Sequence, residues 1–132
     1  DSRIGKRFLF PGIGYGGSCF PKDVKALQKA GRDESYDFKI LDSVIEVNEK
    51  QKTILFPKIQ NFFNGDLSNK KLAVWGLAFK PETDDVREAP AIYLIEKLLN
   101  KGASLSVYDP EAMPNIKKQF GETLNLLETF NL

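Results

Sequence analysis

The sequence contains no histidine and only one cysteine, and these two absences exclude several kinds of functional site. Without histidine, the chain cannot form a histidine metal site or a Cys-His nucleophile pair from its own residues. Any catalytic base must therefore be a carboxylate, a lysine or a water molecule, and we predict no metal site. A single cysteine cannot form a disulfide within the chain, which favours a reducing cytoplasmic location.

Long apolar runs and a strong net charge are also missing. No run approaches the roughly 18 apolar residues that a membrane-spanning helix needs, and the opening DSRIG does not form a secretory signal. The net charge of +1 predicts no general attraction to nucleic acid. The 132 residues can bury one modest core or two small packed units. Because no helix or strand is predicted before the first notable loop, we expect a piece of a longer protein.

The most informative stretch is FLFPGIGYGGSCFPKD, at residues 8–23. Its glycines at positions 12, 14, 16 and 17 allow tight turns and a close approach of the backbone to a ligand. Cys19 follows, with Lys22 and Asp23 close behind. A nearby cation, and a helix beginning near Pro21, would both favour a reactive thiolate. The stretch therefore predicts a nucleophilic cysteine, while a small buried cysteine in a ligand-free flexible loop is the alternative.

The next part of the chain is predicted to be mainly helical. A short helix is expected over residues 21–29, ended by Gly31. Ser35 or Asp37 can cap a much longer amphipathic helix that extends to about residue 64. A long, exposed helix of this kind usually packs against a partner.

Two features interrupt the long helix. Pro57 lies inside it and predicts a kink, or two helices placed end to end. Its apolar stripe also becomes polar over residues 48–52, which read NEKQK.

The last part of the chain has the pattern of a βαβ unit. We predict a buried parallel strand at 71–76, a helix at 89–101 and a second strand at 104–108. A helix near residues 113–120 and a tail at 123–131 follow. The crossover between the two strands should be right-handed.

The fold class is therefore predicted as α/β with a large helical part. An active-site loop and a long central helix are followed by a partial Rossmann-like βαβ domain. The polar, turn-rich segment near residue 66 is the best internal boundary. We divide the chain into a central helical domain with the cysteine loop, residues 1–66, and a Rossmann-like domain, residues 67–132, both partial.

Asp109 ends the second predicted strand, where related folds often place a carboxylate on a ribose. However, the first strand is followed directly by the single glycine Gly76 and not by a G-x-G-x-x-G motif. The spacing from Gly76 to Asp109 is also longer than the usual spacing of about 20 residues. We therefore do not assign this half as the cofactor-binding half. A turn aspartate before Pro110 explains the residue equally well.

Four motifs, in register, resemble the UDP-glucose/GDP-mannose dehydrogenase family. They are RIG at 3–5, GYGGSCFPKD at 14–23, VWGLAFKPETDDVREAP at 74–90 and VYDP at 107–110. Together they extend over essentially the whole chain. Phe20 stands where the GDP-mannose branch tends to have leucine and points to the UDP-glucose branch. Phe10 stands where some relatives carry lysine, which leaves the nucleotide preference less defined.

The resemblance implies an oxidoreductase that oxidises UDP-glucose to UDP-glucuronate with two NAD⁺. Cys19 would form a thiohemiacetal and then a thioester, and Asp23 would position the water that releases the acid. The N-terminal NAD-binding domain of the family is absent from this sequence, so the chain alone should be inactive. The alternatives are a non-catalytic dimerisation and nucleotide-binding module, or a family member acting on GDP-mannose or a UDP-amino sugar.

The same resemblance assigns further residues. Lys22 and Arg87 would contact NAD, and the long central helix would form the core of a homodimer. The candidate substrate-binding residues are Arg3, Phe8, Leu9, Gly16, Phe79 and Lys80. Without the resemblance, the region around Lys80 and Arg87 would be an ordinary solvated charged loop. Thr83, Asp84 and Asp85 are expected to hold it by side-chain bonds to its backbone.

Overall fold

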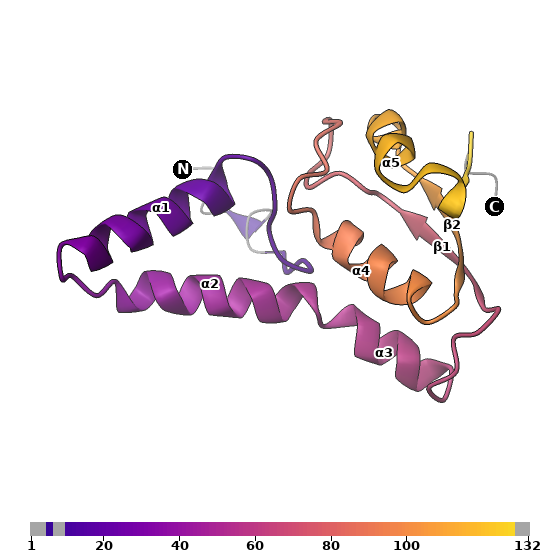
Figure 1. The fold of residues 1–132 in the computed structure, drawn as a ribbon, viewed down its shortest axis with the longest axis horizontal. Helices are drawn as coiled ribbons and strands as arrows, with labels where there is room; N and C mark the ends of the chain where they lie inside the picture. Colours follow the sequence, from indigo (N-terminus) through magenta and orange to yellow (C-terminus); the bar gives the residue numbers. More distant parts are fainter. Residues whose placement is uncertain (1–4, 7–9, 129–132) are drawn as a thin grey trace.

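The computed structural model describes residues 5, 6 and 10–128 and shows a helical arm joined to a small α/β unit (Figure 1). Three of the predicted substrate-binding residues, Arg3, Phe8 and Leu9, lie outside the described residues, as does the end of the predicted tail. Within the part of the chain that is described, no helix is both long and apolar enough to cross a membrane.

The helices α1 (Phe20–Asp33) and α2 (Lys39–Lys52) form an antiparallel hairpin (Figure 1). The predicted end at Gly31 is wrong, because α1 continues to its last residue, Asp33. Gly31 is buried, and a Cβ added there would lie 2.5 Å from the Phe38 ring. This glycine therefore lets an aromatic ring pack directly on the helix backbone, an advantage that outweighs its poor helix propensity.

The second helix begins later than predicted and is followed by a break. Its N-cap is Phe38, without a side-chain cap, so the predicted capping by Ser35 or Asp37 is wrong. After α2 the chain breaks and restarts as α3 (Leu55–Phe62). Two helices end to end are thus confirmed. Pro57 falls in the first turn of α3, where proline is tolerated, so the break precedes it.

The α/β unit contains β1 (Lys71–Trp75), β2 (Ser104–Tyr108) and β3 (Asn125–Leu126) in the order β1-β2-β3, all parallel. Helix α4 (Pro90–Leu99) joins β1 to β2, and α5 (Met113–Phe120) follows β2. The predicted βαβ unit is confirmed, with the second strand and the last helix at their predicted bounds. The predicted tail is wrong in part, because β3 lies within it.

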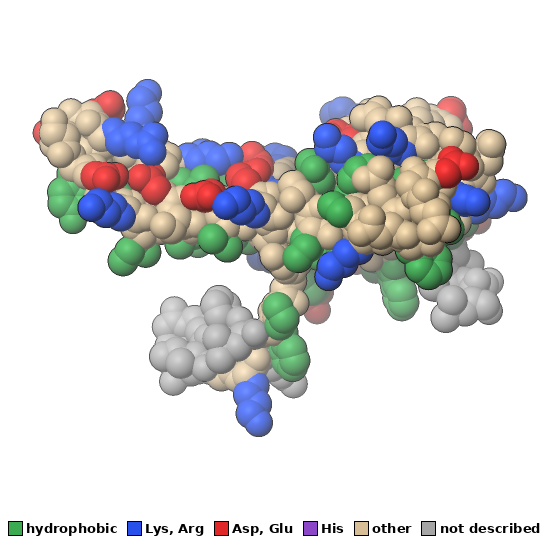
Figure 2. All heavy atoms as spheres, turned by 90° about the horizontal axis from the view of Figure 1, so that it is seen from below, with side chains coloured by type: hydrophobic (Ala, Val, Ile, Leu, Met, Phe, Trp, Pro, Cys, Tyr) green, Lys and Arg blue, Asp and Glu red, His purple; other side chains and the backbone are tan. Residues whose placement is uncertain are grey.

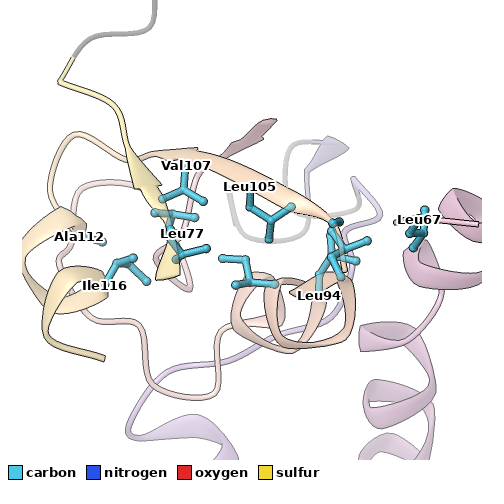
Figure 3. Packing of buried hydrophobic residues seen from close by; sticks show 11 residues of the cluster. Leu67, Leu77, Leu94, Leu105, Val107, Ala112 and Ile116 are labelled. Atoms are coloured by element: carbon cyan, nitrogen blue, oxygen red, sulfur yellow. The ribbon is translucent and has the colours of Figure 1, made fainter. Parts of the chain in front are cut away.

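The core lies on the sheet face that α4 and α5 cover. Figure 3 shows Leu105 and Val107 of β2 facing the two helices, which contribute Leu94 and Ile116. The opposite face of the sheet carries exposed residues. Trp75 is 68% exposed there, so the prediction that β1 is fully buried is wrong. Its side chains alternate between the covered face and the uncovered one.

Candidate functional site

Cys19 is the N-cap residue of α1, and its thiol is exposed. The predicted helix start is confirmed, since α1 begins at Phe20 directly after it. A side chain at this place faces the positive end of the helix dipole. The Ser18 Oγ lies 3.6 Å from the Cys19 Sγ. The buried-cysteine alternative is therefore wrong.

Asp23 lies one helical turn after Cys19, and its N–H donates to the Cys19 carbonyl at 2.8 Å. Residues four apart share one face of a helix. The Lys22 Nζ lies 3.6 Å from the Asp23 Oδ1, and both side chains are exposed. The thiol, the cation and the carboxylate are therefore presented together at the start of α1.

The second part of the chain reaches this site through Arg87. Its guanidinium donates to both carboxylate oxygens of Asp85, at 2.9 and 2.8 Å. These bonds lower the pKa of Asp85 to about 2. The pKa of Arg87 is raised, chiefly by Asp85, with a smaller electrostatic contribution from Cys19. The Arg87 carbonyl accepts a hydrogen bond from Gly17, two residues before Cys19, so the Arg87 segment lies against the cysteine loop.

The glycine loop contacts the segment around Arg87 directly. The Gly17 N–H donates to the Arg87 carbonyl at 2.8 Å, and Gly17 has a φ of +98°. A Cβ on Gly16 would lie 2.2 Å from the Glu88 carbonyl oxygen, and one on Gly17 would lie 2.8 Å from the Phe79 ring. Both glycines are therefore required for close packing. Gly16 and Phe79, which were predicted to bind substrate, contact the Glu88 backbone and Gly17 respectively. The flexible-loop alternative does not describe these residues.

A pocket of about 370 Å³ opens between the two parts of the chain. Its lining residues are Gly17, Ser18, Pro21, Lys22, Lys25, Arg87 and Glu88. Three of these side chains are cationic and one is anionic. A cationic pocket at a helix N-terminus suits phosphate groups, so the residues fit the pyrophosphate of a dinucleotide.

Lys80 faces a second pocket, of about 480 Å³, near the carboxyl ends of β1 and β2. This is the usual place for a ligand in a doubly wound sheet. The Lys80 Nζ also lies 5.3 Å from the centre of the Phe79 ring. Lys80 is therefore not among the residues that line the first pocket, of about 370 Å³. Phe79, the residue before it, packs against Gly17, which does line that pocket.

Asp109 has a structural role. It is 6% exposed, and its carboxylate accepts four backbone N–H bonds. One oxygen binds Leu77 and Ala78 at 2.7 and 3.1 Å. The other binds Glu111 and Ala112, both at 2.9 Å. The turn-aspartate interpretation is therefore confirmed, and both oxygens are already engaged. The carboxylate ties the exit of β1 to the start of α5.

The charged loop before α4 is held as predicted for Thr83 and Asp85. The Asp85 N–H donates to the Thr83 Oγ1 at 3.3 Å, and the Arg87 N–H donates to the Asp85 Oδ1 at 2.9 Å. Asp84 instead accepts from the Asn115 side chain, at its carbonyl and its carboxylate. This loop is thus ordered by its own side chains and by α5.

Sequence reasoning missed the residues of α2 that hold the site together. The Asn48 side chain accepts from the Tyr15 N–H at 2.8 Å and donates to the Tyr15 carbonyl at 3.2 Å. Gln51 donates to the Gly12 carbonyl at 2.6 Å. Lys52 forms an ion pair with Glu88. The sequence feature that could have revealed these contacts is the polar interruption of the apolar stripe at residues 48–52. It marks a surface of α2 that other segments of the protein contact.

Two sequence models of one family match the chain. The central domain of the UDP-glucose/GDP-mannose dehydrogenase family matches residues 1–50, and the UDP binding domain of the same family matches residues 73–132. The chain belongs to the UDP-glucose/GDP-mannose dehydrogenase family. The predicted resemblance is thereby confirmed. The family assignment covers both the cysteine loop and the α/β unit.

Relatives within the family show how much of a typical member is present. The UDP-glucose 6-dehydrogenase of Pseudomonas aeruginosa is 44% identical over 94% of this chain and 27% of its own length. UDP-glucose 6-dehydrogenase TuaD of Bacillus subtilis is 47% identical over 92% of this chain and 26% of its own length. The chain therefore spans about a quarter of these curated relatives.

Solved structures agree with this assignment and confirm the α/β fold class. A UDP-glucose dehydrogenase from Pyrobaculum islandicum superposes with a TM-score of 0.87 at 36% identity, over 98% of this chain and 30% of that one. A GDP-mannose dehydrogenase from Pseudomonas aeruginosa gives a TM-score of 0.77 at 27% identity, over 98% and 31% of the two chains. The fold is thus shared by family members whose names carry different nucleotide sugars.

Proposed function

We propose that this chain is the cysteine-bearing and UDP-sugar-binding part of an enzyme that oxidises UDP-glucose to UDP-glucuronate. The observation that carries the proposal is the exposed Cys19 thiol at the start of α1, in a loop that is hydrogen-bonded to the Arg87 segment. The curated relatives named UDP-glucose 6-dehydrogenase support the choice of substrate. Phe20 supports UDP-glucose over GDP-mannose.

Cys19 is the proposed nucleophile. After the C6 alcohol has been oxidised to an aldehyde, the Cys19 thiolate adds to the carbonyl carbon and forms a thiohemiacetal. When bound, NAD⁺ accepts the hydride in each of the two oxidations. The second oxidation leaves a thioester on Cys19. Water attacks this thioester, releases the carboxylic acid and returns the thiol.

The neighbouring residues are proposed to assist in hydrolysis of the thioester, in cofactor binding and in substrate binding. Asp23, one turn after Cys19, orients and deprotonates the water that attacks the thioester. Lys22 and Arg87 would hold phosphate oxygens of NAD⁺ through charge-assisted hydrogen bonds. Lys80 and Phe79 contact the UDP-sugar from the α/β side. Phe8, Leu9 and the backbone of Gly16 complete the proposed substrate contacts, and Arg3 is proposed to reach the substrate bound by a neighbouring subunit.

The chain is proposed to act within a longer protein. It spans about a quarter of its curated relatives, so an NAD-binding domain is expected to supply the rest of the cofactor site. We further propose a division into a helical domain, residues 1–66, and a UDP-sugar-binding domain, residues 67–132, and a cytoplasmic location. Without the NAD-binding domain, the chain should bind UDP-sugar but not turn it over.

The binding step can be tested on the chain alone by alkylating Cys19 with iodoacetamide. UDP-glucose at about ten times its dissociation constant should slow the reaction by about tenfold, since only the free chain exposes the thiol. GDP-mannose at the same concentration is the matched competitor. Equal rates with and without UDP-glucose, in a folded chain, would contradict the proposed site. Protection by GDP-mannose alone would favour the alternative substrate.

We also propose that α2 forms the core of a homodimer. Exposed apolar side chains lie along it, and together with the cysteine loop they line a groove of about 750 Å³. Figure 2 shows hydrophobic side chains along one side of the helical arm. Ile40 is 83% exposed and Val47 is 64% exposed, so a second copy could bury both. The family resemblance supports a second copy as the occupant.

Replacing Val47 with aspartate should convert the dimer into a monomer. The buried charge would have no partner in the interface, whereas the exposed side chain contributes little to the folding of one copy. Sedimentation equilibrium measures the mass directly. Leu27→Asp, on the exposed side of α1 and outside the groove, is the matched control and should remain dimeric. A monomeric unsubstituted chain would contradict the proposal.

A further inference from the structure

Glu88 lies where three segments of the chain meet. Its Oε1 is 3.3 Å from the Lys25 Nζ on α1, and its Oε2 is 3.0 Å from the Lys52 Nζ on α2. Its carbonyl oxygen lies against Gly16 in the cysteine loop. The residue directly before it is Arg87, which accepts a hydrogen bond from Gly17. A single residue therefore connects both helices of the hairpin and the loop to the α/β unit.

Lys52 depends on this contact. Its side chain is only 8% exposed, and its ammonium is bound by Glu49 at 3.1 Å and by Glu88. Burial lowers the pKa of Lys52, but the bonds to the two carboxylates outweigh it and the pKa is raised. A buried ammonium is costly unless it is paired. Of its two partners, Glu49 belongs to the same helix, so only Glu88 connects Lys52 to the α/β unit.

The backbone of Glu88 gives an independent sign of its role. Its φ is +54°, in the left-handed region that glycine occupies most readily. A residue with a side chain stays in that region only where its surroundings hold it, and such positions gather at functional sites. Glycine would adopt this conformation more easily. The carboxylate is therefore the feature that distinguishes glutamate from a better backbone choice at this position.

We infer that Glu88 is a positioning residue that, through Lys52 and Lys25, holds the helical hairpin and the cysteine loop against Arg87. The contact keeps the Cys19 thiol and the Arg87 guanidinium on the same side of the junction. Its importance for catalysis rests on the proposed function. The mechanical connection itself does not, because it follows from the contacts of Glu88 alone.

Hydrogen exchange of single backbone amides tests the inference on the chain as it is. The Gly17 amide crosses the junction, because it donates to the Arg87 carbonyl. In Glu88→Gln this amide should exchange about tenfold faster or more, since Lys52 and Lys25 lose their charged partner and the junction opens locally. The Tyr15 amide should be unaffected, because Asn48 holds it from α2. The amides of α4 should also be unaffected.

Further variants separate positioning from general stability. Glu88→Gly removes the strain of the positive φ angle but also removes the carboxylate. It should therefore also accelerate exchange of the Gly17 amide. Lys52→Met should do the same, whereas Lys52→Arg keeps the ion pair and should restore protection. Lys50→Met is the matched control, because Lys50 pairs with Glu46 on the exposed surface of the same helix. It should leave the Gly17 amide unchanged.

Two results would overturn the inference. One is unchanged exchange at Gly17 in both Glu88→Gln and Glu88→Gly. The other is an equal acceleration of all amides, including those of α4, which would mean that Glu88 only contributes to global stability. The alkylation experiment on Cys19 tests the proposed function independently of the inference about Glu88. A chain that UDP-glucose fails to protect, but in which Glu88→Gln releases Gly17, would contradict the function and support the inference.

Discussion

Replacing Cys19 with alanine should abolish the conversion of UDP-glucose to UDP-glucuronate, with formation of the acid falling by about 1,000-fold or more, because alanine cannot form the covalent intermediate. Serine at this position should be almost as inactive, since a hydroxyl is far less ionised than a thiol near neutral pH. The measurement joins the chain to the NAD-binding domain of a family member and follows NADH formation. The unsubstituted protein should give about two NADH per UDP-glucose, as two hydride transfers require.

The control for this experiment is Lys29→Ala, which changes an exposed side chain of the same helix and should keep full turnover. Unchanged turnover in both cysteine variants would remove Cys19 as the nucleophile and leave its loop as a binding element. The variants should give at most one NADH per UDP-glucose, because the first oxidation does not use the thiol. Because the thiol is proposed to act on the aldehyde, the loss should then fall on the second oxidation.

The largest effect on stability is expected from Asp109→Asn. The amide keeps one acceptor oxygen but turns an N–H₂ group towards two of the four backbone donors. Two buried N–H groups then lack a partner, which should lower the free energy of unfolding by roughly 2 to 4 kcal/mol. Urea denaturation measures the change. Glu111→Gln makes the same chemical change at an exposed position two residues away and should have little effect.

The same residue should make stability depend on pH. Burial raises the pKa of Asp109, but its four backbone hydrogen bonds outweigh this and hold the pKa below 3.8. A carboxyl group whose pKa is lower in the folded state stabilises the fold above its unfolded pKa, and this contribution is lost as the pH falls through the folded pKa. The difference between the natural chain and Asp109→Asn should therefore be constant from pH 7 to about 4 and shrink below. A constant difference down to pH 2 would contradict this account.

Much of the α/β unit could be predicted from the sequence. The strand at 104–108 and the helix at 113–120 have clear patterns, and glycine or proline marks their ends. The buried status of β1 could not be predicted. An apolar run such as KLAVW does not say whether one or both faces of a sheet are covered, because that depends on where the helices pack.

The differences in the helical part arise at Gly31 and Pro57. Gly31 is a typical helix end, but the Phe38 ring packs on it and extends α1. Pro57 predicted the break in the long helix, yet the chain places it in the first turn of α3, where its missing N–H has no cost. In both cases the local signal was real. For Gly31, the signal lacked the packing partner, which is the Phe38 ring seven residues later.

The candidate site could be predicted only in part. The cysteine loop stands out because glycine clusters and a lone thiol are rare together. Lys52 and Glu88, by contrast, look like ordinary surface charges in the sequence. Their roles depend on a contact between residues 36 positions apart, and no local pattern reports such a contact. The polar interruption at residues 48–52 indicated a change in the surroundings of α2, but not the identity of the partner.

The position of β1 has a consequence for the behaviour of the chain at high concentration. Among the strands that the structure describes, β1 pairs only with β2 and is therefore an edge strand of the sheet. Edge strands are the places where a strand of another chain can pair with a sheet. Lys71 is the first residue of the strand and Lys70 precedes it, so like charges on two copies repel there. These charges therefore oppose edge-to-edge pairing of two copies at β1.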